Sequence, residues 1–274
     1  MRTWPRQRFP VERSGQVNYT AATAIASKDR TGYACACSAL AYSARTNWAL
    51  TVSATGSNNP RDRLENVCKA MHKSLSRLQE AVSFTTYIGA NAQVLNEANH
   101  GRLFGSIQNT FARTMLLDAA RLLENEDGIP LNNVSGAMNI LRSTGVEPDE
   151  PRRLVAALRR NGAEGLSDDQ PTGDLKRYAQ KFLGMRRRPL KKTISTITEI
   201  RNRVLAHADA SVDADLIPKV TYQALDDVIS FLEMFLDVVY YGYLGISPNS
   251  GADATRISAS LRYLLSDAGI VLLD

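Results

Sequence analysis

The sequence predicts an all-α protein: an antiparallel helical bundle with a four-helix core, additional short helices and no sheet in the core. Apolar residues recur every three or four positions over most of residues 71–248, as in helices with one buried face. Turn signals separate these stretches, and none of them alternates apolar and polar residues as a strand would. With 44% hydrophobic residues, the 274-residue chain has enough apolar side chains for a buried core.

The first half of this region predicts three helices. The first carries an apolar stripe over Leu75–Leu95 and ends at Asn99-His100-Gly101. The second has one apolar face over Ile107–Leu123, and the stop signal Asp127-Gly128-Ile129-Pro130 follows it. A third, shorter helix is expected from Val134 to Leu141.

The second half predicts a basic helix and then two longer ones. Residues 151–160 form the basic helix, with its leucines and valine inward and its arginines outward. The next helix is expected to begin with Asp174 as its cap and to stop at Gly184. Pro189 suits the first turn of the helix that follows. The clearest apolar stripe covers Leu225–Tyr243, and a small appended helix is expected over Arg256–Leu265.

Composition divides the chain into three segments: a weakly structured basic tail (1–70), a helical domain (71–248) and a C-terminal appendage with a short helix (249–274). The tail holds ten Lys/Arg against four Asp/Glu, so the basic pI of about 9.1 originates there and says little about the helical domain. A physiological start at Met71, which would exclude the tail, is a further hypothesis.

We expect a cytoplasmic protein with no membrane contact, no metal and no cofactor. The cysteines include the pair Cys35-Ala-Cys37, but no second Cys/His pair has zinc-ligand spacing, so reduced thiols are the simplest interpretation. Residues 1–10 lack the apolar run of a signal peptide. The most apolar stretch, Val228–Ile246, is interrupted by Glu233 and Asp237, which argues against a membrane span.

The segment Arg201-Asn202-Arg203-Val204-Leu205-Ala206-His207 is the candidate for chemistry. It combines a cation for a phosphate with an imidazole that titrates near neutral pH, two groups that can cleave RNA without a metal. On a regular helix six residues rotate the side chain by about 600°, so Arg201 and His207 would point about 120° apart. Either the helix ends near His207, or a second copy of the chain completes the site, and we favour the dimer.

The stretch RNRVLAHAD, together with the later helix DDVISFLEMFLDVVYYGYLG, resembles the HEPN superfamily and, within it, the abortive-infection AbiU-like branch. The helix FARTMLLDAARLLENEDG is similar to the second helix of that branch, and the resemblance covers residues 71–248. Many HEPN proteins are metal-independent endoribonucleases that act as toxins or in phage defence, usually as dimers. Others only bind nucleotides or have lost activity. The resemblance implies RNA as substrate, a homodimer and a possible antitoxin protein as partner.

The resemblance also implies the catalytic set Arg201, Asn202 and His207. In this hypothesis His207 moves a proton to or from the ribose-phosphate linkage, and Arg201 holds the phosphate. Asn202 positions the phosphate or orients the histidine, and Arg203 is a reserve phosphate contact. In the alternative interpretation, His207 only stabilises a helix C-terminus and Arg201 lies on a solvated face, paired with an acid such as Glu199 or Asp209.

A basic cluster directly precedes the motif helix. Residues 152–192 hold twelve Lys/Arg and four Asp/Glu, whereas residues 193–248 hold three and eight. Such a cluster attracts an RNA backbone regardless of its sequence, although it can equally be a solvated turn. The candidate RNA contacts in it are Arg186, Arg187, Arg188, Lys191 and Lys192. The alternatives to a ribonuclease are a non-catalytic helical module that binds RNA, a nucleotide or a protein, and a structural dimerisation unit.

Overall fold

The computed structural model describes residues 59–124, 132–143, 145–202 and 220–246. Every regular element in these ranges is helical and none is a strand, so the predicted all-α class is confirmed. The elements are α3 (Pro60–Ala90), α4 (Ala92–Glu97), α5 (Gly101–Leu123), α6 (Val134–Ser143), α7 (Pro151–Arg160), α8 (Thr172–Arg187), η1 (Arg188–Leu190), α9 (Lys191–Ile200), α10 (Tyr222–Leu236) and η4 (Asp237–Tyr243). None of the described helices combines the length and apolarity needed to span a bilayer.

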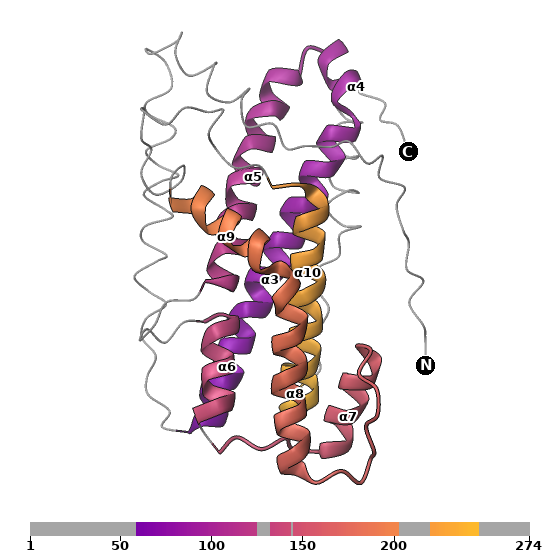
Figure 1. The fold of residues 1–274 in the computed structure, drawn as a ribbon. Coiled ribbons are helices and arrows are strands. Elements are labelled where there is room, and N and C mark those ends of the chain that lie inside the picture. The colour runs from indigo at the N-terminus through magenta and orange to yellow at the C-terminus, as the bar shows by residue number, and fades with distance from the viewer. Residues whose placement is uncertain (1–58, 125–131, 144, 203–219, 247–274) are drawn as a thin grey trace.

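Four long helices form the body of the bundle (Figure 1). α3 and α5 run antiparallel and make the most extensive helix contact. α8 and α10 run antiparallel beside them, and α10 contacts both α3 and α8. α6 packs against the start of α3, and α9 crosses α5 obliquely. Successive long helices thus run antiparallel, as expected for this bundle, although shorter helices lie in the connections between α5 and α8 and between α8 and α10.

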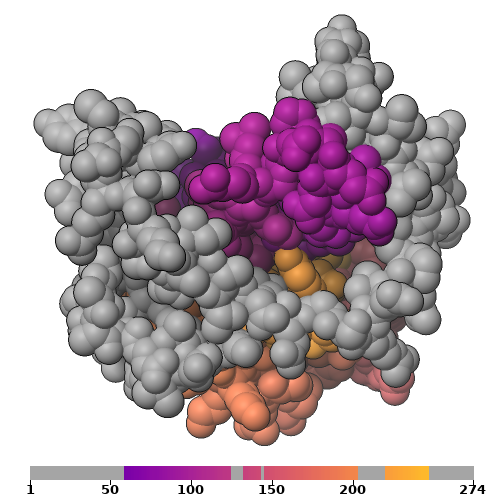
Figure 2. Space-filling view, turned by 90° about the horizontal axis from the view of Figure 1, so that it is seen from above, coloured from indigo at the N-terminus to yellow at the C-terminus, as the bar shows by residue number. Residues whose placement is uncertain are grey.

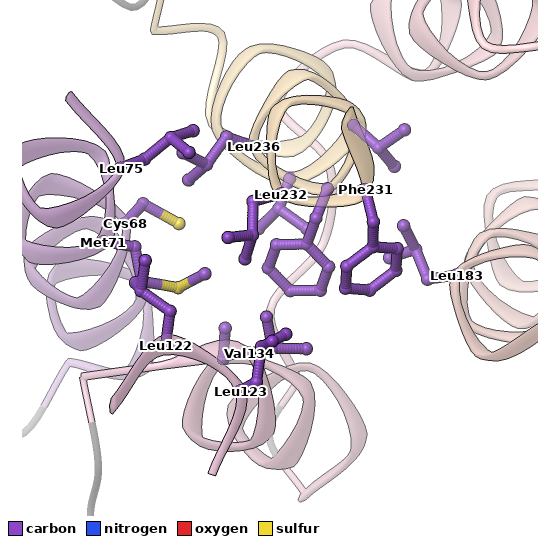
Figure 3. Close-up of a cluster of buried hydrophobic side chains, with 14 of the residues drawn as sticks. Cys68, Met71, Leu75, Leu122, Leu123, Val134, Leu183, Phe231, Leu232 and Leu236 are labelled. Carbon is purple, nitrogen blue, oxygen red and sulfur yellow. The ribbon is translucent and has the colours of Figure 1, made fainter. Parts of the chain in front are cut away.

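The core lies where α3, α5, α6, α8 and α10 meet (Figure 3). Met71 from α3, Leu122 and Leu123 from α5 and Leu232 from α10 are all buried there. Phe231 and Phe235 of α10 are also buried, with ring centroids 6.1 Å apart, and Phe231 lies beside Leu183 of α8 (Figure 3). Aromatic and branched side chains of this size dominate the hydrophobic stabilisation of a bundle.

The first helix begins earlier than the sequence pattern indicated, so the boundary expected between residues 70 and 71 is wrong. Pro60 occupies the first turn of α3, and the Asn59 side chain caps it by accepting from the Arg61 backbone N–H at 3.0 Å. Leu64 and Cys68 are completely buried in the core. Residues 59–70 therefore belong to the helical domain, whereas residues 1–58 lie outside the described ranges.

Two other helix ends differ from expectation. The first predicted helix is divided, because α3 ends at Ala90 and the short α4 follows. α8 begins at Thr172, so Asp174 lies inside its first turn, and the helix continues through Gly184 to Arg187. A glycine costs a helix only about 1 kcal/mol, which packing of the neighbouring residues offsets. The predicted stop at 127–130 and the helix over 256–265 lie outside the described residues.

The far end of the α3–α5 pair has its own small cluster. Ile88 of α3 and Leu95 of α4 are buried there, apart from the main core, with partly buried residues of α5 against them. Viewed from above, α4 and the adjoining ends of α3 and α5 gather on this face (Figure 2). The opposite end of α5 approaches α6, α8 and α9. The motif residue Arg201 lies next to this end, where it pairs with Glu124.

Candidate functional site

The motif residues Arg201 and Asn202 directly follow the last turn of α9. Ile197 and Ile200 are buried and fix α9 against α5. The chain then widens into a π-type turn at Arg201 and Asn202. Wider turns of this kind change the direction of side chains at a helix end and recur at functional sites.

The guanidinium of Arg201 is held from two sides. It forms an ion pair with the carboxylate of Glu124, the residue that caps the end of α5. The Asn202 side-chain oxygen accepts from Arg201 Nε at 3.1 Å and from Nη2 at 2.9 Å. The Arg201 side chain is 24% exposed and that of Glu124 is 14% exposed, so the pair is largely covered but reachable from solvent. The pairing carboxylate thus comes from a distant part of the chain.

Asn133 fixes the backbone of Glu124. Its side-chain amide donates to the Glu124 carbonyl at 3.0 Å, and its side-chain oxygen accepts from the Gly136 backbone N–H at 2.9 Å. The second bond caps the start of α6. Asn133 is buried, so both bonds are shielded from water. The end of α5, the start of α6 and the end of α9 are therefore joined through Glu124.

Arg187 lies on the same side of the bundle and differs from its neighbours in the basic cluster. Its Nη2 donates to the Leu123 carbonyl at 3.0 Å and its Nη1 to the Ser135 hydroxyl at 3.3 Å. Burial lowers the pKa of Arg187, and the nearby positive charge of Arg142 lowers this pKa further. The sequence grouped Arg187 with surface cations, but its side chain points into the bundle.

The remaining members of the basic cluster face outward. Arg186 donates to the Asn161 carbonyl at 3.0 Å, and its guanidinium lies over the Phe182 ring, 5.1 Å from the centroid. Arg188, Lys191 and Lys192 are exposed around η1 and the start of α9. Positive charge therefore lies on the surface one helix length, about 15 Å, before Arg201.

The structure brings Arg201 and Asn202 into contact, but it does not describe the third residue of the predicted catalytic set. Arg203 and His207 lie outside the described residues. Sequence reasoning missed Glu124, Asn133 and Arg142. Glu124 acts through its contact with Arg201, far along the chain, and no local spacing indicates such a contact. Asn133 caps the start of α6 through Gly136, three residues later, and this local signal was overlooked.

A comparison with protein families identifies a match over residues 59–257, well over half of the chain, to the family HEPN_AbiU2, described as AbiU2. The match begins at Asn59, the cap of α3. No curated protein and no solved structure matches the chain.

Proposed function

The chain belongs to the HEPN AbiU2 family, and we propose that it is a metal-independent endoribonuclease of the abortive-infection type. One observation carries the proposal: the arginine of the family-like motif is fixed in place, and part of its surface is open to solvent. A fixed guanidinium can hold a phosphate and stabilise charge that develops during cleavage. Glu124 and Asn202 supply the orientation that this role requires.

In the proposed reaction the imidazole of His207 accepts the proton of a ribose 2′-hydroxyl. The 2′-oxygen then bonds to the adjacent phosphorus, the bond from phosphorus to the 5′-oxygen breaks, and a proton passes to that leaving oxygen. Arg201 donates N–H bonds to the phosphate oxygens. Asn202, whose side-chain oxygen accepts from Arg201, keeps the guanidinium in a fixed orientation. DNA has no 2′-hydroxyl, so RNA is the expected substrate.

The exposed cations support an approach path for RNA. Arg186, Arg188, Lys191 and Lys192 precede Arg201 along α8, η1 and α9. Contacts of this kind bind any phosphate backbone and weaken as salt rises. Arg187 has a different role, because its guanidinium holds the end of α5.

A non-catalytic helical module is the second candidate, and one contact favours it. Both Glu124 and Asn202 engage the Arg201 guanidinium, which joins α5 to α9. An arginine used in this way can serve as a structural clamp without touching RNA. Such a module would bind RNA, a nucleotide or a protein without cleaving it.

Incubation of the protein with total RNA in chelator separates the two candidates. The nuclease predicts cleavage that persists in chelator and disappears in both Arg201→Ala and His207→Ala. Arg102→Ala is the matched control, because Arg102 is exposed at the opposite end of α5. Binding without cleavage would favour the module. Cleavage that persists in both site variants would place the chemistry elsewhere.

We further propose that the active form is a homodimer in which two copies of the motif share one cleft. The support is the family of the chain, because HEPN ribonucleases usually act as dimers. Sedimentation at micromolar protein is expected to show a dimer. A monomer at that concentration would remove the shared cleft from the proposal.

A further inference from the structure

α6, α8 and α10 enclose a small pocket between them. Its volume is about 60 Å³. Phe231 and Phe235 of α10 contribute apolar lining, and hydrogen-bonding groups come from the other two helices. These polar lining residues are Ser135, Asn139, Arg142 and Arg187.

The charged residues that line the pocket, among those that the structure describes, are both positive. Arg142, near the end of α6, and Arg187, at the end of α8, both line it. Among the described residues, no Asp or Glu lines the pocket, and none forms an ion pair with either arginine. Two guanidinium groups close enough to lower the pKa of Arg187 repel each other. An anion between them would relieve this repulsion.

Arg187 is already oriented for such an anion. Its bonds to the Leu123 carbonyl and the Ser135 hydroxyl use two of the five N–H groups of the guanidinium. The others remain as donors, and the half-buried setting strengthens any charge-assisted bond they make.

The pocket volume selects a small ligand. A single water needs about 10–15 Å³ of such space, so about 60 Å³ holds a few waters or one tetrahedral oxyanion. Two arginines match the oxygens of phosphate in the fork geometry that these side chains favour. We propose that this pocket is a binding site for a phosphate group, presented either as free phosphate or as a small phosphate monoester.

The proposed phosphate site is separate from the ribonuclease motif, but one of its residues contacts the end of α5, which holds Arg201. Arg187 holds Leu123, and the next residue, Glu124, pairs with Arg201. Phosphate binding does not require RNA cleavage, so the two proposals can fail independently.

Isothermal titration calorimetry on the full chain tests the proposal, with inorganic phosphate and glycerol phosphate as separate ligands at constant ionic strength. We expect Arg142→Gln to weaken binding about tenfold or more, because it removes one charge-assisted contact. Gly184→Leu is expected to block the pocket. Gly184 lines the pocket, and a Cβ atom added there meets no heavy atom within 4 Å, so the first atom of a side chain fits without a clash. Arg177→Gln is the matched control, since Arg177 lies exposed on the same helix.

The outcomes are distinct. Binding that is weakened by Arg142→Gln and Gly184→Leu but not by Arg177→Gln supports the site. Binding of glycerol phosphate alone identifies an esterified phosphate as the ligand. Failure of both ligands to bind, or equal heat from chloride, overturns the proposal. Binding that survives both pocket variants, each with a cooperative thermal transition, also overturns it.

Discussion

A chain that starts at Met71 is expected to lose its cooperative fold, whereas a chain that starts at Asn59 is expected to keep it. The two differ by twelve residues, which form the cap and first three turns of α3. These turns include Leu64 and Cys68, both completely buried. Removing a buried leucine alone costs about 2–5 kcal/mol, and the whole domain is stable by roughly 5–15 kcal/mol.

The lost segment also carries a tie between distant parts of the fold. Arg61 pairs with Asp149, before α7, and its Nη2 donates to the Leu244 carbonyl, after η4, at 3.3 Å. Asp149 in turn donates its backbone N–H to the Tyr243 carbonyl at 3.0 Å. Without Arg61 the start of α3 no longer joins this junction. The truncation therefore removes packing and an anchor together.

Circular dichroism with thermal and urea unfolding would compare the two chains. We expect the chain from Met71 to lose roughly 5 kcal/mol or more of unfolding free energy relative to the chain from Asn59. Equal transition midpoints for the two chains would contradict this and would restore Met71 as a workable start.

The sequence pattern predicted most helices correctly, and its errors have physical causes. Leu64, Cys68 and Met71 already have helical spacing, but charged residues crowd the first turn of α3 and obscure it. The basic helix over residues 151–160 was predicted correctly as α7, with Leu154 and Leu158 buried. Both its ends carry local signals, a proline at the start and a glycine beyond the end.

The stop expected at Gly184 had a consequence for Arg187. Leu175, Ala179 and Leu183 are buried and spaced four residues apart, so they mark one face of α8. The next residue in this series is Arg187. Extending the helix past Gly184 places the Arg187 side chain on the inner face, where the structure has it. Because the helix was expected to end at Gly184, Arg187 was grouped with the exposed cations around it, although its side chain points into the bundle.

The motif itself could be found from local spacing, but its support could not. Arg201 and Asn202 are adjacent, so the sequence brought them together. Glu124 is separated from Arg201 by α6, α7, α8 and α9, and only the packing of α9 across α5 brings the two residues together. The local pattern of a single sequence does not indicate which distant residues come into contact.

Arg201→Ala is expected to lower RNA cleavage by about 10²–10³-fold and the unfolding free energy by about 1–3 kcal/mol. Loss of one fixed group that stabilises developing charge has an effect of this size on rate. The Arg201–Glu124 pair is largely covered, so removing Arg201 alone leaves the Glu124 carboxylate partly buried without its partner, which costs about 1–3 kcal/mol of unfolding free energy. A domain that is stable by roughly 5–15 kcal/mol stays folded after a loss of this size, so unfolding cannot account for the fall in the cleavage rate.

Glu124→Gln is the matched variant, because it removes the charge of the pair but leaves Arg201 in the chain. If Arg201 holds phosphate, Glu124→Gln retains most cleavage, because the glutamine oxygen can still accept from the guanidinium and orient it. Arg201→Lys does not restore the cleavage that Arg201→Ala loses, because lysine lacks the planar fork. The double variant Arg201→Ala/Glu124→Gln should cleave no better than Arg201→Ala alone. If Arg201 is only a clamp between α5 and α9, Arg201→Ala and Glu124→Gln should reduce cleavage and stability to the same extent. A double-mutant cycle measured on both quantities therefore decides whether this arginine acts on RNA or on the fold.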